Sequence, residues 1–417
     1  MKKISTVLLL LLSLVVFSHP ALYAQHEQHG GIQEVRVGAV EFFSKYAFSA
    51  KGMRVGVICN RTSVMPDGRR LVDKMVESDI NVTAIFTPEH GMEGKVAAGG
   101  SVEQSTDPTL GIPIYSLYGK TNKPTKEMLD GVDALVFDIQ DVGARFYTYI
   151  STMALAMKAA DENRKRFIVL DRPNPINGID VEGPMLDSAQ TSFIGMFPMP
   201  IRHGLTIGEI ARMICYKWWN LGGLDLHIIP MQGWRRTDWL NDITVHWTAP
   251  SPNMKTLQTA TVYPGTCLFE GTNVSEGRGT DKPFEYIGAP WIDEKAFAAK
   301  LNTLNLPGIQ FEPIRFTPKV DSVASPNPKF KGQECGGVFL KVTDRSVLQS
   351  VNITGMMLTT LHSMYPDSLT FIDKQFDLLA GTTTFRTSIL SGNGIDWKQY
   401  NDAVEQFKKD RVEFFIY

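Results

Sequence analysis

The chain has 417 residues and a formal net charge of −2, with 43% hydrophobic and 21% charged residues. These values are typical of globular proteins, and the length suffices for two domains. The near balance of charge gives no reason to expect nucleic acid or an anionic membrane as a partner. The four cysteines are widely spaced and form no CxxC pair, which excludes a disulfide framework and favours buried free thiols at Cys59 and Cys215.

The start of the chain predicts a secretory signal peptide. Two lysines are followed by a leucine-rich run and by the small-residue ending Leu22-Tyr23-Ala24. The apolar run is shorter than the roughly 20 residues that span a bilayer. We therefore expect residues 1–24 to be removed, and the mature protein to be exported to a periplasm or to the medium without membrane insertion.

The following segments predict an α/β fold with a mostly parallel sheet and helices on both faces. Apolar runs indicate buried strands, whereas the spacing of apolar residues in 68–79 and 148–165 indicates helices. Uninterrupted apolar strands that alternate with helices are typical of such sheets. The strands are expected within residues 53–60, 81–86, 112–119, 133–143 and 165–174.

Polar side chains follow four of these predicted strands. In parallel sheets ligands bind outside the carboxyl ends of the strands, so four such ends predict a binding site at this edge. The residues concerned are Asn60-Arg61, Glu89-His90, Asp138 with Asp141, and Asp171-Arg172 with Asn174.

The second half of the chain changes character. A further helix after His203 and a strand at 224–231 continue the pattern, and the segment 247–290, rich in Gly and Pro, is expected to be irregular. From residue 284 helices and strands alternate without polar strand ends, which predicts a smaller α+β domain. The expected domains are residues 33–283 and 284–417.

The stretch TPEHGMEG, residues 87–94, is a candidate catalytic loop. Its glycine spacing matches neither phosphate-binding motif, and a single histidine without HExxH weakens the zinc interpretation. Pro88 and Gly91 indicate a tight turn that would project Glu89 from a strand end as a general acid. Two alternatives stay open: a metal site formed by His90 with Asp138 or Asp141, and a solvated turn without chemistry.

The stretch FDIQDVGARFYTYIS, residues 137–151, is a candidate sugar-binding segment. Asp138, Asp141 and Arg145 supply polar groups, and Tyr147 supplies an aromatic ring, which together suit a polar ligand with an apolar face. The alternative is structural: Asp141 would cap the next helix and pair with Arg145.

Two shorter stretches carry further candidates. In LDRPNPING, Asn174 could bind a ligand, although Asp/Asn-Pro sequences also favour turns. In the segment that follows His203, Thr206 and Glu209 have the spacing of a capping box. We therefore interpret these two as structural and expect His203 to be the residue that reaches a ligand.

The stretch LFEGTNVSEGRGTDKPFEYIGAPW, residues 268–291, is expected to be a functional loop with no helix or strand of its own. Arg278 lies between two glycines and suits a bidentate grip on a substrate carboxylate. Asn273 is a further candidate ligand for a sugar. The alternative is a surface loop braced by internal ion pairs.

The chain resembles the NamZ-type exo-β-N-acetylmuramidases, a family formerly known as a domain of unknown function. The motifs that carry this resemblance are FTPEHGMEG, VFDIQDVGARFYTYI, LDRPNPING and YPGTCLFEGTNVSEGRGTDKPFEYIGAPW. The resemblance extends from about Val35 to Tyr417. It implies a Rossmann-like N-terminal catalytic domain, an auxiliary C-terminal domain, and no metal or nucleotide cofactor. It also implies release of N-acetylmuramic acid from the non-reducing end of peptidoglycan-derived saccharides, with Glu89 as the candidate catalytic glutamate.

We therefore expect Glu89 to be the general acid, His90 its neighbour that tunes charge and position, and Asp138 the second carboxylate. Arg278 would bind the lactyl carboxylate of muramic acid. Two other functions remain alternatives: a metal-dependent hydrolase using His90, Asp138 and Asp141, and an exported sugar-binding protein without activity. The residues expected to contact the sugar are Arg145, Tyr147, Asn174, His203 and Asn273.

Overall fold

The computed structural model describes residues 32–96, 99–100, 104–392 and 394–417. The predicted signal peptide, residues 1–24, lies outside them, so export stays a prediction. Residues Gln33–Tyr417 form one compact unit. No helix within the described ranges is long and apolar enough to cross a membrane. All four cysteines are buried free thiols, which confirms the prediction for Cys59 and Cys215.

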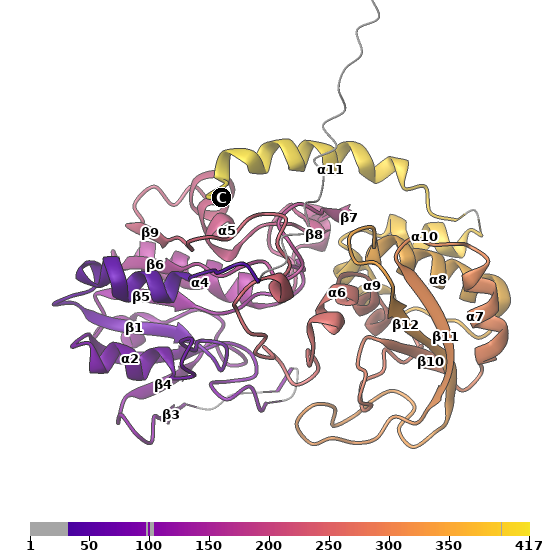
Figure 1. The fold of residues 1–417 in the computed structure, drawn as a ribbon, viewed down its shortest axis with the longest axis horizontal. Coiled ribbons are helices and arrows are strands. Elements are labelled where there is room, and N and C mark those ends of the chain that lie inside the picture. The colour runs from indigo at the N-terminus through magenta and orange to yellow at the C-terminus, as the bar shows by residue number, and fades with distance from the viewer. Residues whose placement is uncertain (1–31, 97–98, 101–103, 393) are drawn as a thin grey trace, which may run out of the picture. The chain divides into compact units, whose positions relative to one another are not determined.

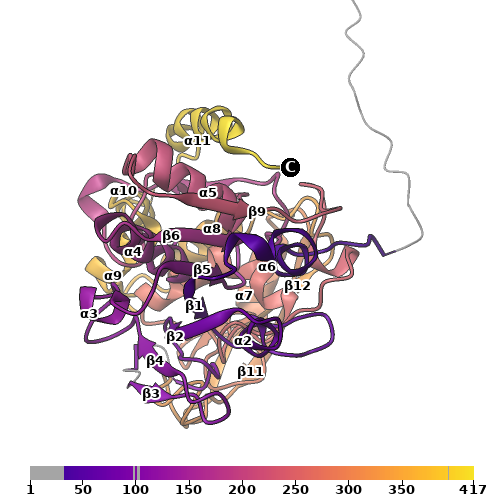
Figure 2. The same cartoon turned by 90° about the vertical axis from the view of Figure 1, so that its left-hand side faces the viewer.

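A seven-stranded sheet organises the first half of the chain, in the order β3-β4-β2-β1-β5-β6-β9 (Figures 1 and 2). Neighbouring strands are parallel except β3, which runs antiparallel to β4 at the edge. Without β3 the order is 3-2-1-4-5-6, that of a Rossmann fold, which confirms the predicted fold class. The strands are β1 Arg54–Cys59, β2 Asn81–Thr87, β3 Ser105–Thr106, β4 Pro113–Ser116, β5 Ala134–Asp138, β6 Arg166–Leu170 and β9 Leu226–Ile229.

Successive side chains of each strand point to opposite faces of this sheet, and both faces are covered by helices. In β5, Leu135 and Phe137 join the apolar cluster that contains α4 and α5, whereas Val136 joins the cluster that contains α2. A strand buried on both faces needs an uninterrupted apolar run, which is why these strands were readable in the sequence. The helices of this half are α1 Gly38–Glu41, α2 Leu71–Glu77, α3 Lys126–Leu129, α4 Tyr149–Glu162 and α5 Ile207–Met213.

The second half contains a smaller antiparallel sheet with the order β10-β12-β11, surrounded by helices. This confirms the smaller α+β part that the sequence predicted. The strands are β10 Tyr286–Ala289, β11 Ile309–Phe316 and β12 Cys335–Val342, and the helices are α6 Leu257–Thr266, α7 Glu294–Asn302, α8 Ser350–Met364, α9 Asp373–Ala380, α10 Thr384–Leu390 and α11 Lys398–Asp410. A two-stranded hairpin, β7 Glu182–Met185 with β8 Pro200–Arg202, lies outside both sheets.

The expectation that 247–290 is irregular was wrong, because this segment contains α6, the 3₁₀ turn η6 (Cys267–Gly271) and β10. Every residue of α6 from Thr259 to Thr266 is buried, so the helix shows no polar face and no helical period. Its sequence, LQTATVYPGT, also contains a proline and a glycine. Gly265 is required by packing, since a Cβ there would lie 1.9 Å from the carbonyl oxygen of Ser350.

The end of the chain packs against the first sheet (Figure 1). After α11, the 3₁₀ turn η7 (Arg411–Phe414) brings the Arg411 guanidinium to backbone carbonyls of Gly204 (2.7 Å) and His203 (3.0 Å). The hydroxyl of Tyr417 donates to Asp171 Oδ2 at 2.8 Å, just beyond β6. These bonds connect the last helix to the carboxyl edge of the sheet.

Burial raises the pKa of Asp171 to about 7, although hydrogen bonds from Gly208, Thr206 and Tyr417 act in the opposite direction. An unfolded aspartate releases its proton near pH 3.9. Between about pH 4 and 7 the folded protein therefore holds a proton that the unfolded chain has released, so this group lowers the free energy of unfolding as pH rises through that window.

We expect the Asp171→Asn variant to lack the contribution of this titrating group. The unfolding free energy of the variant should therefore fall less steeply between pH 4 and 7 than that of the wild type. Urea unfolding at four or five pH values measures the slope. Asp281→Asn, at an exposed aspartate, is the matched control and should keep the wild-type slope. Equal slopes in all three proteins would contradict the assignment.

Candidate active site

A tight turn at the end of β2 positions Glu89. The amide of Gly91 donates to the carbonyl of Pro88 at 3.1 Å, and His90, the third residue of the turn, has φ +72°. A positive φ at this position is characteristic of a type II turn. For a residue other than glycine it costs on the order of 1–3 kcal/mol and occurs preferentially at functional sites. Glu89, the second residue of the turn, is thereby held just beyond the strand end.

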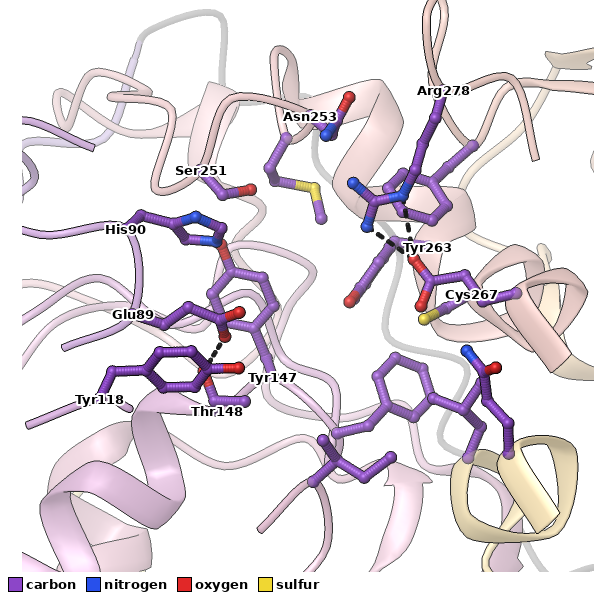
Figure 3. A pocket seen from close by; sticks show the side chains of 17 residues that line it. Glu89, His90, Tyr118, Tyr147, Thr148, Ser251, Asn253, Tyr263, Cys267 and Arg278 are labelled. Carbon is purple, nitrogen blue, oxygen red and sulfur yellow. Dashed lines mark hydrogen bonds and ion pairs between the residues drawn. The ribbon is translucent and has the colours of Figure 1, made fainter. Parts of the chain in front are cut away.

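The two oxygens of the Glu89 carboxylate have different partners. Oε1 accepts from the backbone amide of Gly99 at 2.9 Å, whereas Oε2 lies 2.8 Å from the hydroxyl of Thr148 (Figure 3). An amide can only donate, but a hydroxyl donates or accepts. Oε2 is therefore the oxygen that can carry a proton. The Tyr118 hydroxyl also contacts this carboxylate, and burial, followed by the charge of Glu89, raises the pKa of Tyr118 to about 12.

His90 is buried and held in one tautomer. Its Nδ1 lies 2.7 Å from the carbonyl of Val96, and because a carbonyl only accepts, Nδ1 carries the proton and Nε2 is left as an acceptor. Burial lowers the pKa of His90 below its ordinary value, and the nearby charge of Glu89 only partly offsets this effect. The imidazole is therefore neutral near pH 7.

The opposite wall carries a network of alternating charges. Arg278 donates from Nη2 (2.6 Å) and Nε (3.2 Å) to the same oxygen, Oε1 of Glu270. Glu276 lies 3.5 Å from Nε, and Lys329 binds Glu276 at 3.0 Å. Burial lowers the pKa of Arg278, but the carboxylates of Glu270 and Glu276 outweigh this effect and raise it. The guanidinium also lies over the ring of Phe284, at 5.1 Å from the ring centroid.

Between these walls lies a cavity of about 210 Å³ that both groups line (Figure 3). Aromatic rings form part of its surface: Tyr263 packs edge-to-face against Tyr147 (6.0 Å) and Phe284 (4.8 Å). Ser251 and Asn253 add polar groups. Few polar groups at fixed positions on a largely aromatic surface suit a single sugar residue, which has hydroxyls at its edge and C–H groups on its faces.

Of the predicted site residues, the structure brings Glu89, His90, Tyr147 and Arg278 together around this cavity, and their roles stay predictions. It does not bring Asp138 there. Asp138 is fully buried, and its two oxygens accept from Nε (2.5 Å) and Nη2 (2.8 Å) of Arg172. Both carboxylate oxygens are thus occupied by one guanidinium.

The other predicted sugar contacts bind backbone groups in neighbouring loops. Arg145 is buried, donates to the carbonyls of Pro184, Met199 and Leu379, and has a pKa lowered by burial to about 9. Its partners belong to the β7–β8 hairpin region and to α9, so it links two parts of the chain around the cavity.

Asn174, His203 and Asn273 also have backbone partners rather than a place on the cavity wall. Asn174 donates to the carbonyl of Leu205 (3.0 Å), and Asn273 donates to that of Ser368 (2.7 Å). His203 Nδ1 accepts from the amide of Leu205 (3.1 Å). These three side chains fix loop conformation.

Asp141 does not have the partners that the structural alternative assigned to it. Its Oδ2 accepts from the amide of Gly143 (2.8 Å) and lies 3.5 Å from His203 Nε2, whereas α4 begins after Thr148. The set His90, Asp138 and Asp141 does not converge either. Across the described part of the chain, no three or more His, Cys, Asp or Glu side chains are grouped so that they could hold a metal ion.

Several cavity residues were not predicted. Tyr118 follows β4 and had the same signal as the other strand ends, a polar group after an apolar run. Thr148 lies inside the stretch 137–151 and Glu270 among the polar residues of the stretch 268–291, but neither was given a role. For Ser251 and Asn253, in the stretch PSPN, the sequence offers no signal that separates them from turn residues.

Two family models match the chain. The model described as exo-beta-N-acetylmuramidase NamZ, N-terminal, covers residues 55–258, and the corresponding C-terminal model covers 261–417. The chain belongs to the NamZ exo-β-N-acetylmuramidase family. This is a family of glycosidases, as the motifs predicted. The two models meet near residue 260, and the boundary that we expect at 283/284 stays a prediction.

Individual relatives agree with this assignment. The peptidoglycan beta-N-acetylmuramidase NamZ of Bacillus subtilis (strain 168) is 44% identical over 388 residues, which cover 92% of each chain. Two solved structures of DUF1343 family proteins from Bacteroides fragilis NCTC 9343 are also similar, at 33% and 32% identity with TM-scores of 0.82 and 0.74. Each comparison covers 92% of this NamZ-family chain and 99% of the other.

The buried pair of Asp138 and Arg172 gives a stability prediction. Arg172→Met leaves the Asp138 carboxylate buried without a counterion, which typically costs about 3–5 kcal/mol of unfolding free energy. The double variant Asp138→Leu/Arg172→Met removes both charges and should recover most of that loss. Urea unfolding of the three proteins measures the difference, and a single variant as stable as the wild type would contradict the interpretation.

Proposed function

We propose that the protein releases N-acetylmuramic acid from the non-reducing end of peptidoglycan fragments, with Glu89 as the general acid. The observation that carries this proposal is the asymmetric environment of the Glu89 carboxyl group, in which one oxygen faces an amide and the other a hydroxyl. The family assignment supports the substrate class. Export, which rests on residues 1–24, is part of the same proposal.

Glycoside hydrolysis needs a proton on the leaving oxygen and a group that takes a proton from the attacking water. The contact of Oε1 with Gly99 keeps the carboxyl group in place in both protonation states. When Oε2 carries the proton, Thr148 accepts from it; when the proton has left, Thr148 donates to it. Glu89 can therefore donate and regain a proton without moving.

Recognition of muramic acid requires a group that binds its lactyl carboxylate, and we assign this role to Arg278. Its Nε and Nη2 are occupied by Glu270. Within the described residues, Nη1 makes no hydrogen bond, and it points toward the interior of the cavity (Figure 3). Because two carboxylates and two cations balance on this wall, we infer that Arg278 distinguishes muramic acid by a directed hydrogen bond and not by an excess of positive charge.

Glu89→Gln should lower kcat on an unactivated aryl β-N-acetylmuramide by about 10²–10⁴-fold, because the amide keeps the bond to Gly99 but cannot protonate the leaving oxygen. Glu93→Gln, on an exposed residue of the same loop, is the matched control and should act like the wild type. Release of the phenol is the measurement. A rate of the Glu89→Gln variant equal to that of the wild type would exclude the general-acid role. If the protein only binds sugars, neither the wild type nor any variant would release phenol.

Arg278→Lys should reduce the preference for muramides. Lysine keeps a positive charge beside Glu270 but loses the planar fork and the Nη1 donor. Loss of one hydrogen bond to a carboxylate corresponds to about 1.5–3 kcal/mol, or roughly 10–100-fold in kcat/KM. The check is the ratio of kcat/KM between matched aryl β-N-acetylmuramide and β-N-acetylglucosaminide; an unchanged ratio would refute the role.

A further inference from the structure

A second carboxylate group, that of Glu270, lines the same cavity as Glu89 but lies on the wall formed by the second half of the chain. Its side chain is 23% exposed, in contrast to Asp138, which is fully buried. Both hydrogen bonds from Arg278 go to Oε1, as the dashed lines from Arg278 in Figure 3 show. Among the described residues nothing donates to Oε2, so this oxygen keeps its lone pairs for a ligand.

The backbone around Glu270 is held rigidly. Lys329 donates to the carbonyls of Phe269 (2.7 Å) and Val274 (3.0 Å), on either side of Glu270. Gly271 packs so closely on α9 that a Cβ there would lie 2.5 Å from Cα of Phe376. Catalytic groups need this kind of support, because small displacements weaken their action on the transition state.

The ion pair between Glu270 and Arg278 also fits a role of Glu270 in catalysis. Arg278 holds one oxygen of Glu270 in a forked contact. A second cation, Lys329, binds the neighbouring carboxylate of Glu276. In the part of the chain that the structure describes, the hydrogen-bond partners of Glu89 are, in contrast, an amide and hydroxyl groups. Glycosidases typically place one carboxyl group that gives a proton and one ionised carboxylate on different sides of the scissile bond.

We propose that Glu270 is the second carboxylate of the reaction, with Oε2 facing the anomeric carbon of the bound sugar. This inference rests on the proposed function. As the bond between C1 and the leaving oxygen breaks, its electron pair stays on that oxygen, which takes the proton from Glu89. Positive charge develops on C1 and on the ring oxygen, and the carboxylate of Glu270 stabilises it. The oxygen of a water molecule then forms the new bond to C1, and Glu89, which has given up its proton, takes one from that water. This role replaces the one that we predicted for Asp138.

A purely structural role for Glu270 is the competing explanation, since it also anchors Arg278. Glu276 provides the matched control because it contacts the same guanidinium, at 3.5 Å, and is bound by Lys329. If Glu270 acted only by holding Arg278, Glu270→Gln and Glu276→Gln would have similar effects. If it acts on the sugar, only Glu270→Gln would stop the reaction.

The experiment compares Glu89→Gln, Glu270→Gln and Glu276→Gln on two aryl β-N-acetylmuramides, one with a dinitrophenol leaving group and one with unsubstituted phenol. Dinitrophenolate leaves without a proton, so Glu89→Gln should lose much less activity on this substrate than on the phenyl substrate. Glu270→Gln should lose about 10²–10³-fold on both, because charge develops at C1 whatever the leaving group. Glu276→Gln disturbs the same guanidinium and should lose much less activity than Glu270→Gln on both substrates.

Each outcome is decisive. Circular dichroism and urea unfolding first establish that the variants are folded. If Glu270→Gln does not fold, Glu270→Asp, which keeps the charge, serves as the second variant. A folded Glu270→Gln enzyme with the wild-type rate on the dinitrophenyl substrate would overturn the proposal, as would equal losses in Glu270→Gln and Glu276→Gln. A wild-type protein that hydrolyses neither muramide would instead refute the proposed function itself.

Discussion

The buried ion pair between Asp138 and Arg172 determines where a ligand can bind in this fold. Asp138 ends β5 and Arg172 follows β6, while the hydroxyl of Ser63, after β1, donates to the backbone carbonyl of Asp138. Three strand ends are thus joined at the place between β1 and β5 where the strand order reverses. In dinucleotide-binding proteins of this topology the ligand binds at that place. Here the pair fills it with protein, and the cavity forms beside it, at the ends of β2 and β4.

Two different chemical environments face each other across the cavity. On the side of the first sheet, an amide and hydroxyl groups surround Glu89, and they tolerate a carboxyl group in either protonation state. On the other side, Glu270 and Arg278 form an ion pair at 2.6 Å. The amide belongs to Gly99, in the loop after β2, and one hydroxyl to Thr148, just before α4, whereas Glu270 lies in η6 and Arg278 in the glycine-rich loop that follows it. Buried arginines such as Arg145, bound only to carbonyls, connect the two sides.

Much of the fold was predictable from the sequence because it depends on local patterns. Apolar runs marked the strands. Glu89 and Arg278, which both line the cavity, could be selected as candidates because a short turn and a glycine-flanked arginine are visible without tertiary information. Asp138, Asn174 and His203 had equally good sequence signals, yet they bind a guanidinium or backbone groups of neighbouring loops. Whether a polar side chain after a strand faces a ligand or a loop depends on contacts between distant segments. The helix α6 was missed for a related reason, since burial on all sides removes the period that reveals a helix.

The balance of charge around Arg278 has a consequence for the encounter between enzyme and substrate. Glu270 and Glu276 offset Arg278 and Lys329, and the whole chain carries a formal charge of only −2. Such a surface produces little long-range attraction for an anionic saccharide, so ionic strength will have little influence on how fast the substrate arrives. Under the proposed function, the sugar would be selected after entry into the cavity, through contacts at hydrogen-bonding distance, and not during diffusion.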